Sequence, residues 1–179
     1  MPAVVGWWKS AGMTALRFRM AVRAVILDDD DRILLCRFSA PHPAVPDGAE
    51  EVWSAPGGGV EPTENPLEAL SRELREETGL VLHDRPPHVW HQEVIGDGHG
   101  EDCDGVINDY FLVRAGHFEP LGTLPAESIK VEGISALRWW SLEEIRTAET
   151  LFSPRDLHLR LPPLIDGLIP ADPITLDQP

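Results

Sequence analysis

Three glutamates, Glu73, Glu76 and Glu77, are spaced so that one helix would present all of their carboxylates on the same side. Residues three and four positions apart are neighbours on a helix surface, so these carboxylates would repel one another if nothing lay between them. A hard divalent cation relieves that repulsion, because Mg²⁺ binds carboxylate oxygens together with substrate phosphates. Acidic runs on helices are usually no more than solvated faces, so a metal site needs support from neighbouring residues.

The segment before the glutamates supplies that support. The run Gly57-Gly58-Gly59 follows a predicted strand at 52–54 and precedes the helix, so its backbone carbonyls can approach a bound ion. Glu64 lies eight residues before Arg72, which is close enough, after a loop turn, for an ion pair that fixes the loop on the helix. The glycine loop, the expected ion pair and the three glutamates together predict a metal-binding site.

The helix that carries the glutamates has recognisable ends. Asn65 is a favourable N-cap, Pro66 suits the first helical position, and Glu68 stands where a capping box places its acidic residue. Gly79 is placed to end the helix in a left-handed conformation. Leucines at helical spacing give the helix a face to bury: Leu67, Leu70 and Leu74.

The segment from Gly58 to Leu80, GGVEPTENPLEALSRELREETGL, resembles the Nudix box. The box reads Gly, five residues, Glu, seven residues, Arg-Glu-apolar, one residue, Glu-Glu, one residue, Gly-apolar, and this chain matches each position. The resemblance covers roughly residues 17–150 and implies the fold of the Nudix superfamily. That fold is an α+β structure, an α/β/α sandwich in which helices flank a mixed β-sheet.

The resemblance also implies an activity, the hydrolysis of a pyrophosphate bond in a nucleoside diphosphate linked to another moiety. Mg²⁺ or Mn²⁺ would be the cofactor, held by Glu73, Glu76 and Glu77 with the carbonyl of Gly57. Loop and helix would be oriented by the remaining box residues: Gly58, Glu64, Arg72 and Gly79. The general base would be a box glutamate, Glu76 or Glu77, or a glutamate of a later loop, for which Glu127 is our candidate.

Two other classes share the implied fold. One is a catalytically silent nucleotide sensor or regulator, and the other is a diphosphate isomerase of the isoprenoid type. Sensors commonly lose box glutamates, and the isomerase box departs from the pattern kept here. The intact set of glutamates therefore favours a hydrolase.

Base recognition usually requires an aromatic plate or an apolar slot. Trp53, Trp90 and Tyr110 are the candidates for contact with the substrate, together with Phe38, although aromatic residues on strands more often belong to the core. No subclass signature is present, so the nucleotide derivative stays open. Five histidines show no metal-ligand spacing and are assigned no role: His83, His88, His91, His99 and His117.

Composition limits the partners. The chain has 179 residues, 42% of them hydrophobic, which fits one globular domain. A net charge of −15 argues against a nucleic acid polymer or an anionic membrane as the main partner, and favours a small nucleotide that arrives with its charge carried by metal. Without a long apolar run or a signal-peptide pattern, we expect a cytoplasmic protein.

Three segments are expected along the chain. Residues 1–15, with Trp7 and Trp8, form an arm that packs on the domain or on the second subunit of a homodimer; residues 16–150 form the Nudix domain. Residues 151–179 form a helical extension, interrupted at Pro162-Pro163, and a loose tail. Strands are predicted at 17–27, 32–38, 52–54, 89–95, 107–114 and 136–140, with another beginning at 81–82. The run Asp28–Asp31 predicts a turn rather than a metal site.

Overall fold

The computed structural model describes residues 16–42, 44–96, 103–122 and 133–177. The predicted arm at 1–15 lies outside this part of the chain. The described elements are β1 (Phe18–Leu27), β2 (Ile33–Ser39), β3 (Glu51–Ser54), α1 (Pro66–Glu77), β4 (His88–Ile95), β5 (Gly105–Arg114), β6 (Ile134–Trp140), α3 (Leu142–Thr147), β7 (Phe152–Ser153), α4 (Leu157–Ile165) and β8 (Ile174–Leu176). No helix among these is long and apolar enough to cross a membrane.

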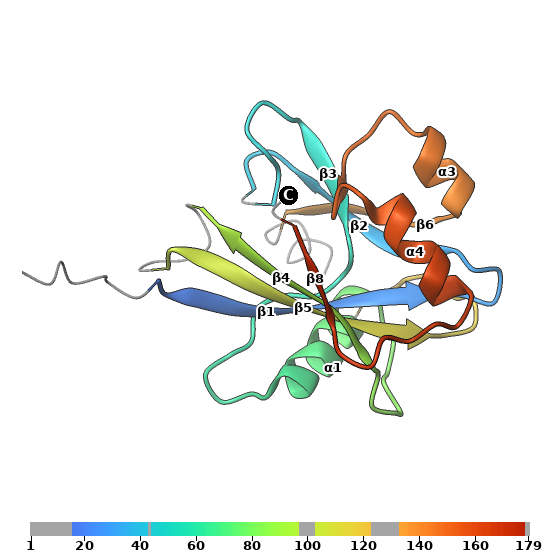
Figure 1. Ribbon diagram of the computed structural model, residues 1–179, viewed down its shortest axis with the longest axis horizontal. Coiled ribbons are helices and arrows are strands. Elements are labelled where there is room, and N and C mark those ends of the chain that lie inside the picture. The colour runs from blue at the N-terminus through green and yellow to red at the C-terminus, as the bar shows by residue number, and fades with distance from the viewer. Residues whose placement is uncertain (1–15, 43, 97–102, 123–132, 178–179) are drawn as a thin grey trace, which may run out of the picture.

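The strands form one mixed sheet in the order β7-β3-β2-β1-β5-β4-β8, with β6 also paired to β2. Strands β1 and β5 pair in parallel over the whole length of β1. The pairing of β1 with β2 is local by comparison: it is at Leu27 and Ile33, next to the turn that connects the two strands. The two halves of the sheet diverge from that turn (Figure 1). Residues from both halves, on β1, β2 and β5 among others, line one cavity, and the candidate site lies there.

Helices cover both faces of the sheet, with α1 on one side and α3 and α4 on the other (Figure 1). Alternation along β1 explains this arrangement, because successive side chains of a strand point to opposite faces. Val22 and Ala24 pack in the cluster formed with α1, and Val25 packs in the cluster that includes α3 and α4. The predicted α/β/α sandwich is confirmed.

The ends of α1 are those that its sequence predicts. The side chain of Asn65 accepts hydrogen bonds from the backbone N–H groups of Leu67 and Glu68, at 3.0 and 3.1 Å. The carboxylate of Glu68 in turn accepts from the N–H of Asn65 at 2.8 Å, which completes the capping box. Gly79 follows the helix with φ of 79°, a conformation that favours glycine.

The C-terminal segment is more ordered than its sequence predicts. The helix α4 continues through Pro162 and Pro163 instead of stopping there. Each proline lacks a backbone N–H, so the helix loses two hydrogen-bond donors. The buried leucines of α4 nevertheless hold the helix against the sheet. The last residues also depart from the expected loose tail, because β8 pairs in parallel with β4. No strand forms at 81–82, where the chain runs irregularly from α1 towards β4.

Candidate active site

A cavity of about 420 Å³ opens where β1 and β2 diverge. Glu73 and Glu77 reach it from α1, and the Gly57-Gly58-Gly59 loop forms part of its wall. Backbone hydrogen bonds fix this loop along the edge of β1 that β2 leaves free. They run from the N–H of Val22 to the carbonyl of Gly58 at 2.9 Å, and from the N–H of Ala24 to the carbonyl of Pro56 at 2.8 Å. The loop therefore takes the place of a strand beside the site.

The glycines of the loop are required by close packing. Gly57 has φ of 133°, and a Cβ there would collide with the backbone carbonyl of Val22. A Cβ on Gly58 would collide with the carboxylate of Glu73. The N–H of Gly57 donates to Oε2 of Glu77 at 2.8 Å. The loop and the two carboxylates thus lie in direct contact.

Arg72 joins the loop to the helix, as its spacing from Glu64 predicts. Its Nε and Nη2 donate to the two carboxylate oxygens of Glu64, at 2.6 and 2.9 Å, and Nη2 also donates to the carbonyl of Gly59 at 3.0 Å. The side-chain hydrogen bond from Arg72 lowers the pKa of Glu64 to about 2. Glu64 is therefore ionised throughout the neutral range and keeps the guanidinium in place.

The three predicted metal-ligating glutamates differ in their surroundings. Glu73 and Glu77 are 8% and 3% exposed and line the cavity, whereas the side chain of Glu76 is 27% exposed and lies 3.4 Å from Nη1 of Arg72. Burial raises the pKa of Glu73, although the hydrogen bond from Arg72 at 2.8 Å opposes that shift. Buried carboxylates that converge on a cavity are a donor set suited to a hard cation, because Mg²⁺ prefers oxygen ligands.

Residues 17–160 match the family model of the NUDIX domain. The chain belongs to this family. A curated relative, the RNA pyrophosphohydrolase of Halorhodospira halophila (strain DSM 244 / SL1), is 46% identical over 63 residues, which are 35% of this chain and 30% of that protein. The chain spans about a third of the length of the curated relatives that it matches.

Solved structures support the same family assignment. The crystal structure of the MutT protein from Methanosarcina mazei Go1 is similar with a TM-score of 0.59 and 25% identity, over 83% of this chain and 95% of that chain. The solution structure of the E. coli ORF135 protein is similar with a TM-score of 0.57 and 28% identity, over 88% of this chain and 96% of that chain. The NUDIX fold thus extends over most of this chain.

Two of the residues predicted to contact the substrate lie outside the lining of the cavity. Trp53 and Trp90 are 6% and 1% exposed, and both lie in the core cluster that packs under α3 and α4 instead of lining the cavity. Tyr110 does line the cavity, but its hydroxyl donates to Oε1 of Gln92 at 3.2 Å, and burial raises its pKa to about 12. Phe38 also lines the cavity.

Several residues of this NUDIX site were not predicted from the sequence. Arg19, Ala21 and Arg23 line the cavity from alternate positions of β1. A sequence signal that could have identified them is the placing of arginines on alternate positions of a predicted strand, in a chain whose net charge is strongly negative. Arg23 donates to the carbonyl of Gly57 at 2.7 Å. That carbonyl, a predicted metal ligand, would therefore share its lone pairs between the guanidinium and an ion.

One predicted catalytic residue, Glu127, lies outside the described part of the chain. Its assignment as the general base stays a prediction. His99, one of the histidines to which no role was assigned, lies outside as well.

Proposed function

We propose that this NUDIX protein hydrolyses a pyrophosphate bond in a nucleoside diphosphate linked to another moiety, with Mg²⁺ or Mn²⁺ as its cofactor. One observation carries the proposal. Two buried carboxylates, Glu73 and Glu77, line the same cavity as three arginines, Arg19, Arg23 and Arg155. The carboxylates suit a divalent cation, and the guanidiniums suit phosphate oxygens.

The residues of the site fit the metal that the family implies. Glu73 and Glu77, with Glu76 beside them and the Gly57 carbonyl across the loop, provide oxygen donors and net negative charge. A bound divalent ion polarises a phosphoryl oxygen, neutralises developing charge and lowers the pKa of bound water. Arg72 keeps the loop on the helix, so these donors are positioned before an ion or substrate arrives.

The chain's own residues would orient the substrate. Arg23 is held by the carbonyls of Gly57 and Ala55, at 2.7 and 3.4 Å, which places its guanidinium beside the loop that contacts Glu77. Phosphate groups bound by this arginine would lie next to the carboxylates. Phe38 stacks on His42, with ring centroids 4.6 Å apart, and both rings line the cavity in which a base would lie. The base that activates water would be Glu76, Glu77 or Glu127.

A small nucleotide is the substrate class that the charge favours. The relative from Halorhodospira halophila is named an RNA pyrophosphohydrolase, so the 5′ end of an RNA is the second substrate to test. With a net charge of −15, this chain would repel the phosphates of a long polymer beyond its reacting end. We therefore propose that any activity on RNA is confined to its terminal phosphates.

The test is product release from a substrate panel in the presence of Mg²⁺ or Mn²⁺. The panel contains nucleoside triphosphates, nucleotide sugars, dinucleoside polyphosphates and a 5′-triphosphorylated oligonucleotide. We expect hydrolysis that stops on chelation, and a loss of about 100-fold in turnover for Glu77→Gln at limiting metal, the scale seen when one electrostatic contact to the transition state is removed. Glu143→Gln makes the same charge change on the exposed surface of α3 and should keep full activity.

The result also decides between enzyme and sensor. Tight binding of a panel member without turnover would establish the silent nucleotide sensor and overturn the hydrolase. Unchanged turnover in Glu77→Gln would remove Glu77 from the metal site.

A further inference from the structure

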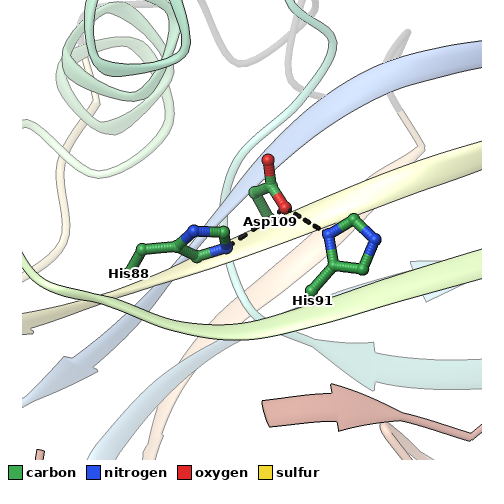
Figure 2. A group of neighbouring side chains, drawn as sticks. All are labelled: His88, His91 and Asp109. Carbon is green, nitrogen blue, oxygen red and sulfur yellow. Dashed lines mark hydrogen bonds and ion pairs between the residues drawn. The ribbon is translucent and has the colours of Figure 1, made fainter. Parts of the chain in front are cut away.

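Two histidines and an aspartate meet on the sheet, outside the cavity. His88 and His91 belong to β4 and Asp109 to β5, and Figure 2 shows both imidazoles turned towards the carboxylate. Nδ1 of His91 lies 2.8 Å from Oδ1 of Asp109, and Nε2 of His88 lies 3.1 Å from the same oxygen. One ligand atom from each residue falls within 4.8 Å of the others. The cluster is distinct from the glutamates of α1.

A β-bulge brings the histidines together, which is why their spacing gave no signal. Residues three apart on a regular strand point to opposite faces. The register between β4 and β5 shifts between His88 and Trp90, so an additional residue of β4 is accommodated there. An additional residue reverses the side on which His88 would otherwise lie. The prediction that these two histidines have no role rested on regular spacing, which the bulge breaks.

We propose that His88, His91 and Asp109 form a binding site for a transition-metal ion of the zinc class. Imidazole nitrogen with one carboxylate oxygen is a common ligand set for Zn²⁺, and tetrahedral bonds of 2.0–2.2 Å place ligand atoms about 3.3 Å apart. The two distances to Asp109 are within half an ångström of that value. The two imidazole nitrogens lie within 4.8 Å of each other, so a rotation of the two rings towards a common point would admit the ion. The carbonyl of Trp90, 3.0 Å from Nε2 of His88, or a water would complete the coordination.

The surroundings hold the rings in position. His88 stacks on Phe111 with ring centroids 4.9 Å apart and an interplanar angle of 25°. Nε2 of His91 lies 3.6 Å from Oε1 of Glu93. A carboxylate beside the second ring nitrogen of a metal-bound histidine fixes its tautomer and strengthens the ligand. The side chains of the three ligands are 15–31% exposed, so an ion can enter from solvent.

An ion at this site would link β4 to β5 next to the bulge, because its ligands come from both strands. The opposite face of β4 carries Gln92 and Val94, which line the cavity. The zinc would therefore stabilise a strand that forms the cavity wall. The same contacts also suit two imidazoles that are both hydrogen-bonded to one carboxylate without an ion, and a failed zinc titration would favour that arrangement.

The experiment titrates Zn²⁺ calorimetrically into the full chain in saturating Mg²⁺, which occupies hard oxygen sites. We expect one Zn²⁺ per chain and a melting temperature that rises by several degrees. His88→Ala and His91→Ala should each weaken binding by at least 100-fold, since loss of a residue that merely supports a ligand already costs about 10–100-fold. His83→Ala removes an exposed histidine that precedes β4 and should bind zinc like the wild type.

Two further measurements separate this site from the cavity. A double variant, Glu73→Gln with Glu77→Gln, should keep its zinc affinity, because the proposal does not depend on the hydrolase site. In the wild-type chain, imidazole nitrogen resonances of His88 and His91 should shift during the titration, which requires no variant to fold. Absence of zinc binding in Mg²⁺, or zinc affinity that survives both histidine variants, would overturn the proposal.

Discussion

At the scale of single residues, Arg72 connects the parts of the candidate site. Its guanidinium donates to Glu64, to the Gly59 carbonyl and to Oε1 of Glu73, with distances between 2.6 and 3.0 Å. Arginine presents donors in a rigid planar fork, so one side chain reaches the loop and the helix at the same time. A lysine carries the same charge on a single nitrogen. The geometry, and not the charge alone, therefore orders the loop.

We predict that Arg72→Lys destabilises the fold by about 1.5–3 kcal/mol, the range for lost hydrogen bonds to charged groups. The variant should also bind Mg²⁺ more weakly, because Glu73 and the loop lose their shared partner. Urea unfolding with and without Mg²⁺ measures both effects. Arg146→Lys, on the exposed side of α3, is the matched control. Equal stability of the two variants would show that Arg72 acts through charge alone.

At the scale of elements, the turn between β1 and β2 sets where the sheet divides. The side chain of Asp28 is fully buried and accepts hydrogen bonds from the N–H groups of Asp30 and Arg32, at 3.0 and 2.9 Å, and from Nε of Arg32 at 2.9 Å. Burial acts to raise the pKa of Asp28, but the hydrogen bonds from Arg32, Asp30 and His117 outweigh it and hold the pKa below its ordinary value. The turn that the aspartate run predicts is confirmed.

The lowered pKa of Asp28 predicts a pH dependence of stability. A carboxyl group with a lower pKa in the folded chain stabilises it above the unfolded-state pKa, and that contribution is lost as the pH falls through the folded pKa. Asp28→Asn should therefore be less stable than the wild type by about 1–3 kcal/mol at neutral pH. The difference should shrink as the pH falls below about 4, where the unfolded aspartate takes up its proton.

Urea unfolding of both proteins across that pH range measures the difference. Asp29→Asn changes the same charge on an exposed neighbour and should follow the wild type throughout. If the difference in unfolding free energy between Asp28→Asn and the wild type stays constant with pH, hydrogen-bond geometry, and not ionisation of Asp28, accounts for the lost stability.

The elements also show how far the sequence can predict this molecule. The strands from β1 to β6 and the capped α1 have local signals, namely alternation, caps and turn residues, and they appear within two residues of their predicted positions. The face to which Trp53 and Trp90 point depends on which side α3 and α4 cover, and no local pattern contains that information. The same holds for β8, which is too short to be recognised without its partner strand β4.

At the scale of the whole molecule, the C-terminal segment completes both the core and the cavity wall. Helix α4 buries Leu157, Leu161 and Leu164 in the cluster beneath it. Strand β8 covers the edge of β4, and the carbonyl of Asp177 accepts a hydrogen bond from Nε2 of Gln92 at 2.9 Å. Since Gln92 also accepts from Tyr110 in the cavity wall, the end of the described chain is linked to the site by two hydrogen bonds.

The two apolar residues of β8 allow this contribution to be measured. Leu176 is 4% exposed and belongs to the core, whereas Ile174 on the same strand is 43% exposed. Leu176→Ala should destabilise the chain by about 2–5 kcal/mol, because it removes buried methyl groups and leaves a cavity. Ile174→Ala should change stability by less than about 0.5 kcal/mol, as surface substitutions usually do. Urea unfolding gives both values, and hydrogen exchange of the β4 amides shows whether the strand loosens with β8. If Leu176→Ala leaves stability and exchange unchanged, β8 is a dispensable edge, and the cavity wall is held by β4 and β5 alone.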